Sequence, residues 1–187
     1  RKLSLIWGES EKTLKAHQAL DFDDLILKTV LLFKKDKEAR THYQNLWQYI
    51  LIDEYQDTNK SQYELSKILA EKHRNVCVIG DIDQAIYGWR GADFRNIINF
   101  ERDFPEVKTI VFEENYRSTK NILEAAAKVI EKNKMRKEKK LTATREDGAN
   151  ISLFEAMNEK EEAEFVVHKI KEILGAGGKS SEVAILY

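Results

Sequence analysis

An apolar run that ends in two adjacent carboxylates is the feature that most constrains how this chain can fold. Residues 49–57 read Tyr-Ile-Leu-Ile-Asp-Glu-Tyr-Gln-Asp. The first four of these residues are typical of a strand that is buried on both faces, as in a parallel sheet. Asp53 and Glu54 then lie at the carboxyl end of that strand, where open α/β sheets bind their ligands. Acids at such an edge need a cationic or polar partner, so the pair predicts a hydrated magnesium ion on a nucleotide phosphate. The simpler alternative is a strand that ends in two solvated acids.

Apolar and amphipathic segments alternate along the chain, which predicts an α/β fold with a parallel sheet. Strands are expected at Tyr49–Asp53, Asn75–Asp81, Val107–Phe112, Ile151–Glu155 and Val183–Tyr187. Helices are expected from Asp21 onward, over Lys37–Trp47, Asn59–Glu71, Asp93–Glu101 and Thr119–Lys132, and from Asn158 to Leu174. Asp93 is expected to cap its helix, and Asn158 with Glu161 is expected to form a capping box.

Charge and cysteine content limit the classes of protein to which the chain can belong. Thirty-one Lys and Arg residues oppose 32 Asp and Glu residues, a net charge of −1 that gives no global signal for nucleic acid. Cys77, the single cysteine, lies in an apolar run and is expected to be a buried, inert thiol. The four histidines lack metal-ligand spacing. One basic run predicts either a solvated face or a contact with DNA phosphates. It comprises Lys132, Lys134, Arg136, Lys137, Lys139 and Lys140.

Two sequence signals are missing. No apolar run reaches membrane-spanning length and the first residues lack the apolar core of a signal peptide, so we expect no membrane contact and a reduced, cytoplasmic setting. The sequence also contains no Gly-x-x-x-x-Gly-Lys-Ser/Thr phosphate loop. Its nearest match, Gly175–Ser180, has the wrong glycine spacing and follows a helix, so we expect a helix stop there.

Three sequence blocks carry a resemblance to a known family. They are Asp53–Asn59 (Asp-Glu-Tyr-Gln-Asp-Thr-Asn), Gly80–Asp93 (Gly-Asp-Ile-Asp-Gln-Ala-Ile-Tyr-Gly-Trp-Arg-Gly-Ala-Asp) and Glu114–Thr119 (Glu-Asn-Tyr-Arg-Ser-Thr). In this order and at this spacing they resemble the Walker B segment, the third motif and the fourth motif of UvrD/Rep/PcrA-type superfamily 1 DNA helicases. The resemblance covers nearly the whole chain from about Ala19 onward.

The resemblance implies a parallel-sheet P-loop NTPase with ATP and Mg²⁺ as cofactors. Residues 1–19 are then the tail of an inserted helical subdomain. Residues 20–113 are the C-terminal part of a first RecA-like motor domain, and residues 114–187 begin a second RecA-like domain. Because the phosphate loop is missing, we expect an internal fragment of a longer helicase that does not hydrolyse ATP alone. Its sheet would have an unpaired edge, through which the fragment could self-associate.

The resemblance also implies roles for the polar residues at the strand ends. Asp53 would hold the magnesium ion through its water shell, and Glu54 would orient and polarise the attacking water. Gln84 carries both a donor and acceptors, and it would sense the γ-phosphate or that water.

The second block ends in residues that suit single-stranded DNA. Tyr87 and Trp89 with Arg90 offer stacking surfaces, each of which contributes about 1–3 kcal/mol per base without reading sequence. The alternative for the two aromatic residues is ordinary core packing. Ala85 and Gly88 depart from the serine and the larger residue that the family usually has, and Gly88 loosens the backbone.

The third block supplies Arg117, whose guanidinium matches phosphate oxygens. The resemblance implies an arginine finger that stabilises charge on the transferring phosphoryl group. A surface salt bridge to Glu113 or Glu114 is the alternative. Tyr116 would stack on the nucleotide or brace the domain interface.

The function that the resemblance implies is part of an ATP-dependent 3′–5′ DNA helicase or translocase. Its partners would be single-stranded DNA and junctions between single- and double-stranded DNA. Two alternatives stay open: a helicase–nuclease subunit of the AddA type, and a truncated non-catalytic homologue that binds DNA or a partner protein.

Overall fold

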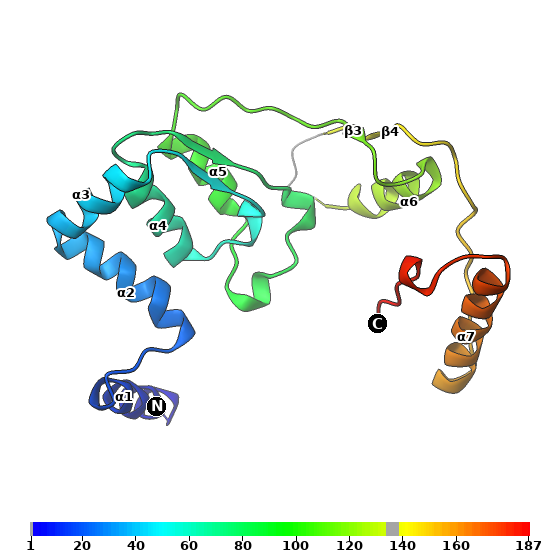
Figure 1. Cartoon of the computed structure of the whole chain (residues 1–187), viewed down its shortest axis with the longest axis horizontal. Helices are drawn as coiled ribbons and strands as arrows, with labels where there is room; N and C mark the ends of the chain where they lie inside the picture. Colours follow the sequence, from blue (N-terminus) through cyan, green and yellow to red (C-terminus); the bar gives the residue numbers. More distant parts are fainter. Residues whose placement is uncertain (1, 134–138) are drawn as a thin grey trace. The chain divides into compact units, whose positions relative to one another are not determined.

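A computed structural model describes residues 2–133 and 139–187 of the chain (Figure 1). The chain divides into two compact units. The first unit comprises Arg1–Glu113 with Ala127–Lys140, and the second comprises Glu114–Ala126 with Leu141–Tyr187. Each unit has a small parallel sheet and helices, so the α/β class predicted from the sequence is confirmed.

Helices make up most of the first unit. They are α1 (Lys2–Ala16), α2 (Phe22–Lys35), α3 (Lys37–Leu46), α4 (Lys60–Ala70) and α5 (Arg95–Asp103). Polar residues begin three of them: Asp21 accepts from Asp24 N at 2.8 Å, and Asp36 accepts from Ala39 N at 2.9 Å. Asn59 and Gln62 form a reciprocal capping box at α4. Among the described helices, none is long and apolar enough to cross a membrane.

Helix α5 differs from its prediction at its start. Phe94, and not Asp93, is the residue before the helix, and its side chain makes no cap. The Asp93 carboxylate instead accepts from the Arg95 backbone N–H at 3.1 Å and pairs with the Arg95 guanidinium at 2.7 Å. The acid therefore stabilises the same first turn from one position further upstream.

Two short parallel strands form the sheet of the first unit. Strand β1 (Ile50–Ile52) pairs with β2 (Val76–Val78), and Leu51 lies opposite Cys77. The prediction of a parallel pair is confirmed, but burial on both faces is wrong. Leu51 is 75% exposed, and Cys77 is exposed instead of buried. Strand side chains alternate between faces, and the core covers one face only.

That core lies between the sheet, α4 and α5. Its buried members are Tyr55, Tyr63, Ala70, Phe100 and Phe104, and the alternate strand residues Ile50, Ile52, Val76 and Val78 pack against it. Helix α2 adds Val30 and Phe33 to the buried residues, whereas Phe22 and Leu25 at its start are exposed.

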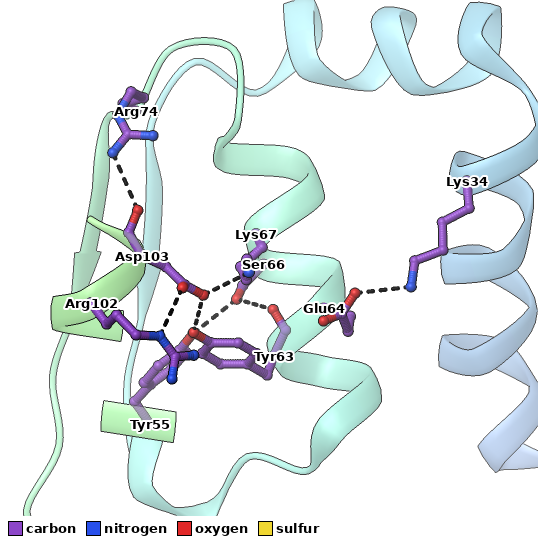
Figure 2. A network of polar contacts seen from close by, with 9 residues as sticks. All are labelled: Lys34, Tyr55, Tyr63, Glu64, Ser66, Lys67, Arg74, Arg102 and Asp103. Carbon is purple, nitrogen blue, oxygen red and sulfur yellow. Dashed lines mark hydrogen bonds and ion pairs between the residues drawn. The ribbon is translucent and has the colours of Figure 1, made fainter. Parts of the chain in front are cut away.

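A polar network fixes α4 to the end of α5 (Figure 2). The Tyr63 hydroxyl donates to Asp103 Oδ2 at 2.6 Å, and Lys67 pairs with the same oxygen at 2.6 Å. Tyr55, which is fully buried, shares a hydrogen bond with Ser66 at 3.0 Å. Burial and the hydrogen bond to Asp103 raise the pKa of the Tyr63 hydroxyl. The network therefore satisfies the polar atoms that the aromatic core carries inside.

The second unit has a shorter sheet, helix α7 and most of helix α6. Strands β3 (Glu114–Asn115) and β4 (Thr142–Ala143) are parallel, and α6 (Lys120–Ile130) and α7 (Glu159–Gly175) follow them in turn. The last turn of α6, from Ala127 onward, is assigned to the first unit. Asn158 caps α7 by accepting from Lys160 N and Glu161 N. The predicted capping box is half formed, because Glu161 accepts from the Met157 N–H and not from that of Asn158.

Three predicted strands are wrong. In the described part of the chain, Val107–Phe112, Ile151–Glu155 and Val183–Tyr187 form no ladder. Val107 packs against the core, but the other apolar side chains of the first two segments are exposed, Phe112 by 75% and Leu153 by 97%. An apolar run becomes a strand only where a neighbouring strand accepts its backbone hydrogen bonds, and the described residues supply none there.

Candidate active site

The paired acids lie on a sharp turn directly after β1. Asp53 Oδ1 accepts from the Glu54 backbone N–H at 2.9 Å. Glu54 has φ 50° and ψ 42°, the left-handed region that residues other than glycine rarely adopt. Both residues are exposed, and the 3-10 helix η1 (Tyr55–Asp57) follows them at once. The turn thus carries both carboxylates out of the sheet at its carboxyl edge.

Gln56 joins this turn to the end of β2. Its side-chain amide is buried, with the residue 1% exposed. Nε2 donates to Glu54 Oε2 at 2.6 Å, and Oε1 accepts from the Asp81 backbone N–H at 2.9 Å. A Cβ at Gly80 would lie 2.9 Å from Gln56 Oε1, so a larger residue there would force the amide to shift. Sequence reasoning assigned Gln56 no role, since only the fold shows that it is buried between two strand ends.

Asp81 holds the next part of the second block. Its Oδ2 accepts from Gln84 Nε2 at 2.8 Å, and its Oδ1 accepts from the Asp83 N–H at 3.0 Å. Gln84 ends the 3-10 helix η2 (Ile82–Gln84). The contacts therefore run from Glu54 through Gln56 and Asp81 to Gln84, and they bring both predicted site residues to one edge of the sheet.

A lysine from the basic run also reaches this edge. Lys139 pairs with Asp81 and lies 3.6 Å from Asp83 Oδ2. Burial would raise the pKa of the Asp81 carboxyl, but the hydrogen bonds from Lys139 and Gln84 outweigh it and lower that pKa. Lys139 is thus neither fully solvated nor free for DNA. Lys134, Arg136 and Lys137 of the run lie outside the described residues.

The end of the second block is exposed. Trp89 is 79% exposed and Tyr87 is 39% exposed, so core packing is wrong for the tryptophan. The Arg90 guanidinium lies 5.3 Å from the Trp89 ring centre and 6.0 Å from that of Tyr87. Trp89 and Arg90 belong to the 3-10 helix η3 (Gly88–Arg90), and Tyr87 directly precedes it. A Cβ at Gly88 would meet nothing within 4 Å, so the absence of a larger residue is not imposed by packing.

Thr58 anchors the far end of the same block. Its carbonyl accepts from the Asp93 N–H at 3.0 Å and from Asn96 Nδ2 at 2.9 Å. Thr58 and Asn96 are buried. Since Gln56 holds the near end at Asp81, the stretch that follows β1 fixes both ends of the segment Gly80–Asp93.

Tyr116 and Arg117 belong to the second unit. Asn115 Oδ1 accepts from the Arg117 N–H at 3.0 Å and from the Ser118 N–H at 2.7 Å, which shapes the turn after β3. The Tyr116 hydroxyl donates to Glu114, and this bond raises the pKa of Tyr116. Arg117 is exposed, and within the described ranges it makes no salt bridge to Glu113 or Glu114.

The acid turn suits a hydrated magnesium ion. Among residues 2–133 and 139–187, no group of three or more His, Cys, Asp or Glu side chains is placed to hold a metal ion. Magnesium needs no such cage, because it is held by one or two carboxylates together with substrate phosphates and water. Over the same residues, Asp53 Oδ2 and Glu54 Oε1 accept no hydrogen bond, so each acid keeps one free oxygen.

Comparison with known families decides the identity of the chain. The UvrD/REP helicase N-terminal domain matches residues 1–105, and the UvrD-like helicase C-terminal domain matches residues 110–187. The chain belongs to the UvrD/Rep helicase family. Its UvrD/Rep relatives include the ATP-dependent DNA helicase PcrA of Staphylococcus epidermidis, which is 55% identical over 185 residues, and that of Staphylococcus aureus, which is 51% identical over 185 residues. Each alignment covers 99% of this chain and 25% of the relative, so the chain spans about a quarter of their length.

Proposed function

We propose that this chain is part of an ATP-dependent DNA helicase that moves 3′ to 5′ along single-stranded DNA in the cytoplasm. Family membership supports this function, since the relatives are named ATP-dependent DNA helicases. The observation that carries it is the series of contacts from Glu54 through Gln56 and Asp81 to Gln84. It connects a pair of acids to the segment that exposes Trp89.

In the proposed function, residues 20–113 and 114–187 contribute to two RecA-like motor domains, and residues 1–19 to a helical subdomain. Asp53 binds Mg²⁺ through water, and Glu54 orients the attacking water. Bound magnesium would neutralise charge on the ATP phosphates. Gln84 contacts the γ-phosphate or the same water. Arg117 stabilises the transferring phosphoryl group, and Tyr116 contacts the nucleotide.

The nucleic-acid partner is single-stranded DNA, alone or at a junction with duplex. Bases would stack on Tyr87 and Trp89, and Arg90 would contact the backbone or a base face. The exposure of Trp89 and its cation–π contact with Arg90 support this role. The β1–β2 sheet also leaves outer strand edges available for self-association of the isolated chain, which light scattering would detect.

The test is Glu54→Gln in the full-length helicase. Glutamine keeps an oxygen for the Gln56 donor but cannot act as a base. We expect ATP binding to persist while DNA-stimulated hydrolysis falls by about 10²–10⁴-fold, the contribution typical of a positioned acid–base group. Glu155→Gln, at an exposed position of the second unit, is the matched control and should hydrolyse ATP normally. Near-normal turnover in Glu54→Gln would refute the proposed role of the acid pair.

A further inference from the structure

We infer that Gln56 is a positioning residue that couples the orientation of Glu54 to the segment Gly80–Asp93. The inference rests on the proposed function, because it assumes that Glu54 orients the attacking water. The buried amide of Gln56 contacts Glu54 with its nitrogen and the start of the DNA-facing segment, at Asp81, with its oxygen.

The chemistry of the two contacts requires an amide at this position. Glu54 Oε2 is a carboxylate oxygen that can only accept, whereas the Asp81 N–H can only donate. Gln56 meets the first at 2.6 Å with its NH₂ group and the second at 2.9 Å with its oxygen. A flipped amide would place donor against donor and acceptor against acceptor, so the observed orientation is the one that satisfies both partners.

Burial makes both contacts costly to lose. Gln56 is 1% exposed, so water cannot replace either partner in place. The bond to Glu54 is assisted by the charge of the carboxylate, which makes it stronger than a bond between neutral groups. A weaker contact at 3.4 Å also joins Nε2 to Asp57 Oδ2. The acid next to the reacting water therefore has its orientation set from inside the protein.

The packing around Gly80 shows that the site is built around this amide. A Cβ there would lie 2.9 Å from Gln56 Oε1 and 2.9 Å from Ile97 Cδ1 of α5. Both separations are shorter than real Cβ contacts, so a larger residue at position 80 would force the ends of these two side chains to shift. A change in the Glu54 carboxylate that moves Gln56 would also act on the Asp81 peptide, because the Gln56 oxygen accepts from the Asp81 N–H at 2.9 Å.

Asp81 connects Gln56 to the residues proposed to contact the nucleotide and the DNA. The Asp81 side chain holds Gln84 at 2.8 Å, and five residues further along lies the exposed Trp89. Hydrogen bonds thus lead from Glu54 to Gln84, and the five residues of chain that follow lead to Trp89, so stacking of a base there would be connected to rearrangement at Glu54. DNA would stimulate hydrolysis by favouring the Gln56 geometry that orients Glu54.

The first test is Gln56→Met in the full-length helicase, with Gln48→Met at an exposed position as the matched control. Methionine keeps the size of the side chain but supplies neither donor nor carbonyl. We expect kcat for DNA-stimulated ATP hydrolysis to fall by about tenfold to hundredfold, as for loss of one hydrogen bond to a charged group. The KM for ATP and the Kd for single-stranded DNA should change by less than about twofold. Unchanged kcat would overturn the inference.

The second test separates coupling from a merely structural role. Gln56→Glu keeps an oxygen that can accept from the Asp81 N–H but removes the donor to Glu54. We expect the ratio of kcat with DNA to kcat without DNA to fall by about tenfold, because the contact that orients Glu54 is lost while the contact with the DNA-facing segment remains. A ratio equal to that of wild type would overturn the inference, even if Gln56→Met fails to fold.

The two hypotheses fail in different ways. If the wild-type protein shows no DNA-stimulated hydrolysis, the proposed function fails and takes the inference with it. If the wild-type protein is stimulated by DNA and Gln56→Met is stimulated equally, the proposed function stands and only the coupling role of Gln56 is refuted.

Discussion

Asp103 shows how a single residue can set the acid stability of the first unit. Lys67 and Tyr63 donate to its carboxylate, and these bonds lower its pKa to about 2. The unfolded chain lacks those partners, so the group titrates there near its ordinary value of 3.8. Since the folded pKa is the lower one, the ionised carboxylate stabilises the fold above about pH 4. That stability is lost as the pH falls from about 4 towards 2.

The corresponding variant is Asp103→Asn in the 187-residue chain. We expect the free energy of unfolding at pH 7 to fall by about 1–2 kcal/mol, since a charge-assisted network becomes neutral while remaining partly exposed. Urea unfolding at neutral pH and near pH 3 measures it, and the difference from wild type should shrink at the lower pH. Asp23→Asn on the exposed side of α2 serves as the control. An equal difference at both pH values would contradict the assignment of the stability to the Asp103 carboxylate.

Individual site residues differ in how far the sequence can predict them. Asp53, Glu54 and Gln84 stand out because polar residues follow apolar runs, and the structure does bring them to one edge. Gln56 does not stand out, since its role depends on a contact with the Asp81 N–H, 25 positions away along the chain. The error at Cys77 has a related cause: hydropathy identifies a strand but does not show which of its faces the core covers.

At the scale of elements, helices were predicted better than strands. Asp21, Asn59 and Asn158 begin their helices as expected, because capping is a local interaction between residues a few positions apart. A strand depends on a partner that is distant in sequence. Val107–Phe112 has the composition of a strand, yet the described residues provide no ladder for it.

The 3-10 helix η3 exposes Trp89 beside Arg90, and we predict that it contributes to binding of single-stranded DNA. In the full-length helicase, Trp89→Ala should weaken single-stranded DNA binding by about fivefold to hundredfold, the loss of one stacking surface. DNA-stimulated turnover should fall with it, while the KM for ATP stays near that of wild type. Fluorescence anisotropy with labelled oligonucleotides measures the affinity.

Trp7→Ala is the matched control, since Trp7 is 65% exposed on α1 and lies outside the three sequence blocks. If Trp89→Ala bound DNA and hydrolysed ATP as well as this control, stacking on η3 would not contribute to the function.

At the scale of the whole molecule, the acids and the arginine belong to separate units. Asp53, Glu54 and Gln84 lie in the first unit, and Tyr116 and Arg117 lie in the second. The two matched family domains meet between residues 105 and 110, close to the boundary between these units. A nucleotide contacted by both sets would draw the units together, in keeping with the proposed arginine finger.

Arg117→Ala in the full-length helicase tests that arrangement. We expect hydrolysis to fall by about 10³–10⁵-fold, the range that arginine fingers contribute, while ATP still binds. A pair of fluorophores, one on each unit, should report an ATP-dependent approach in wild type and a smaller one in the variant. Arg145→Ala, at an exposed arginine of the second unit, controls for the loss of positive charge. Unchanged turnover would exclude the finger role.

The two attachments of the segment Gly80–Asp93 have one more consequence. Gln56 grips its beginning and Thr58 its end, so a six-residue stretch after β1 clamps a surface loop at both ends. Both ends of this segment are therefore fixed to the same short stretch, while Trp89 between them is 79% exposed. Under the proposed function, a movement of residues 53–58 during ATP hydrolysis would act on both ends of the segment at once and would displace the Trp89 indole relative to a bound strand of nucleotides.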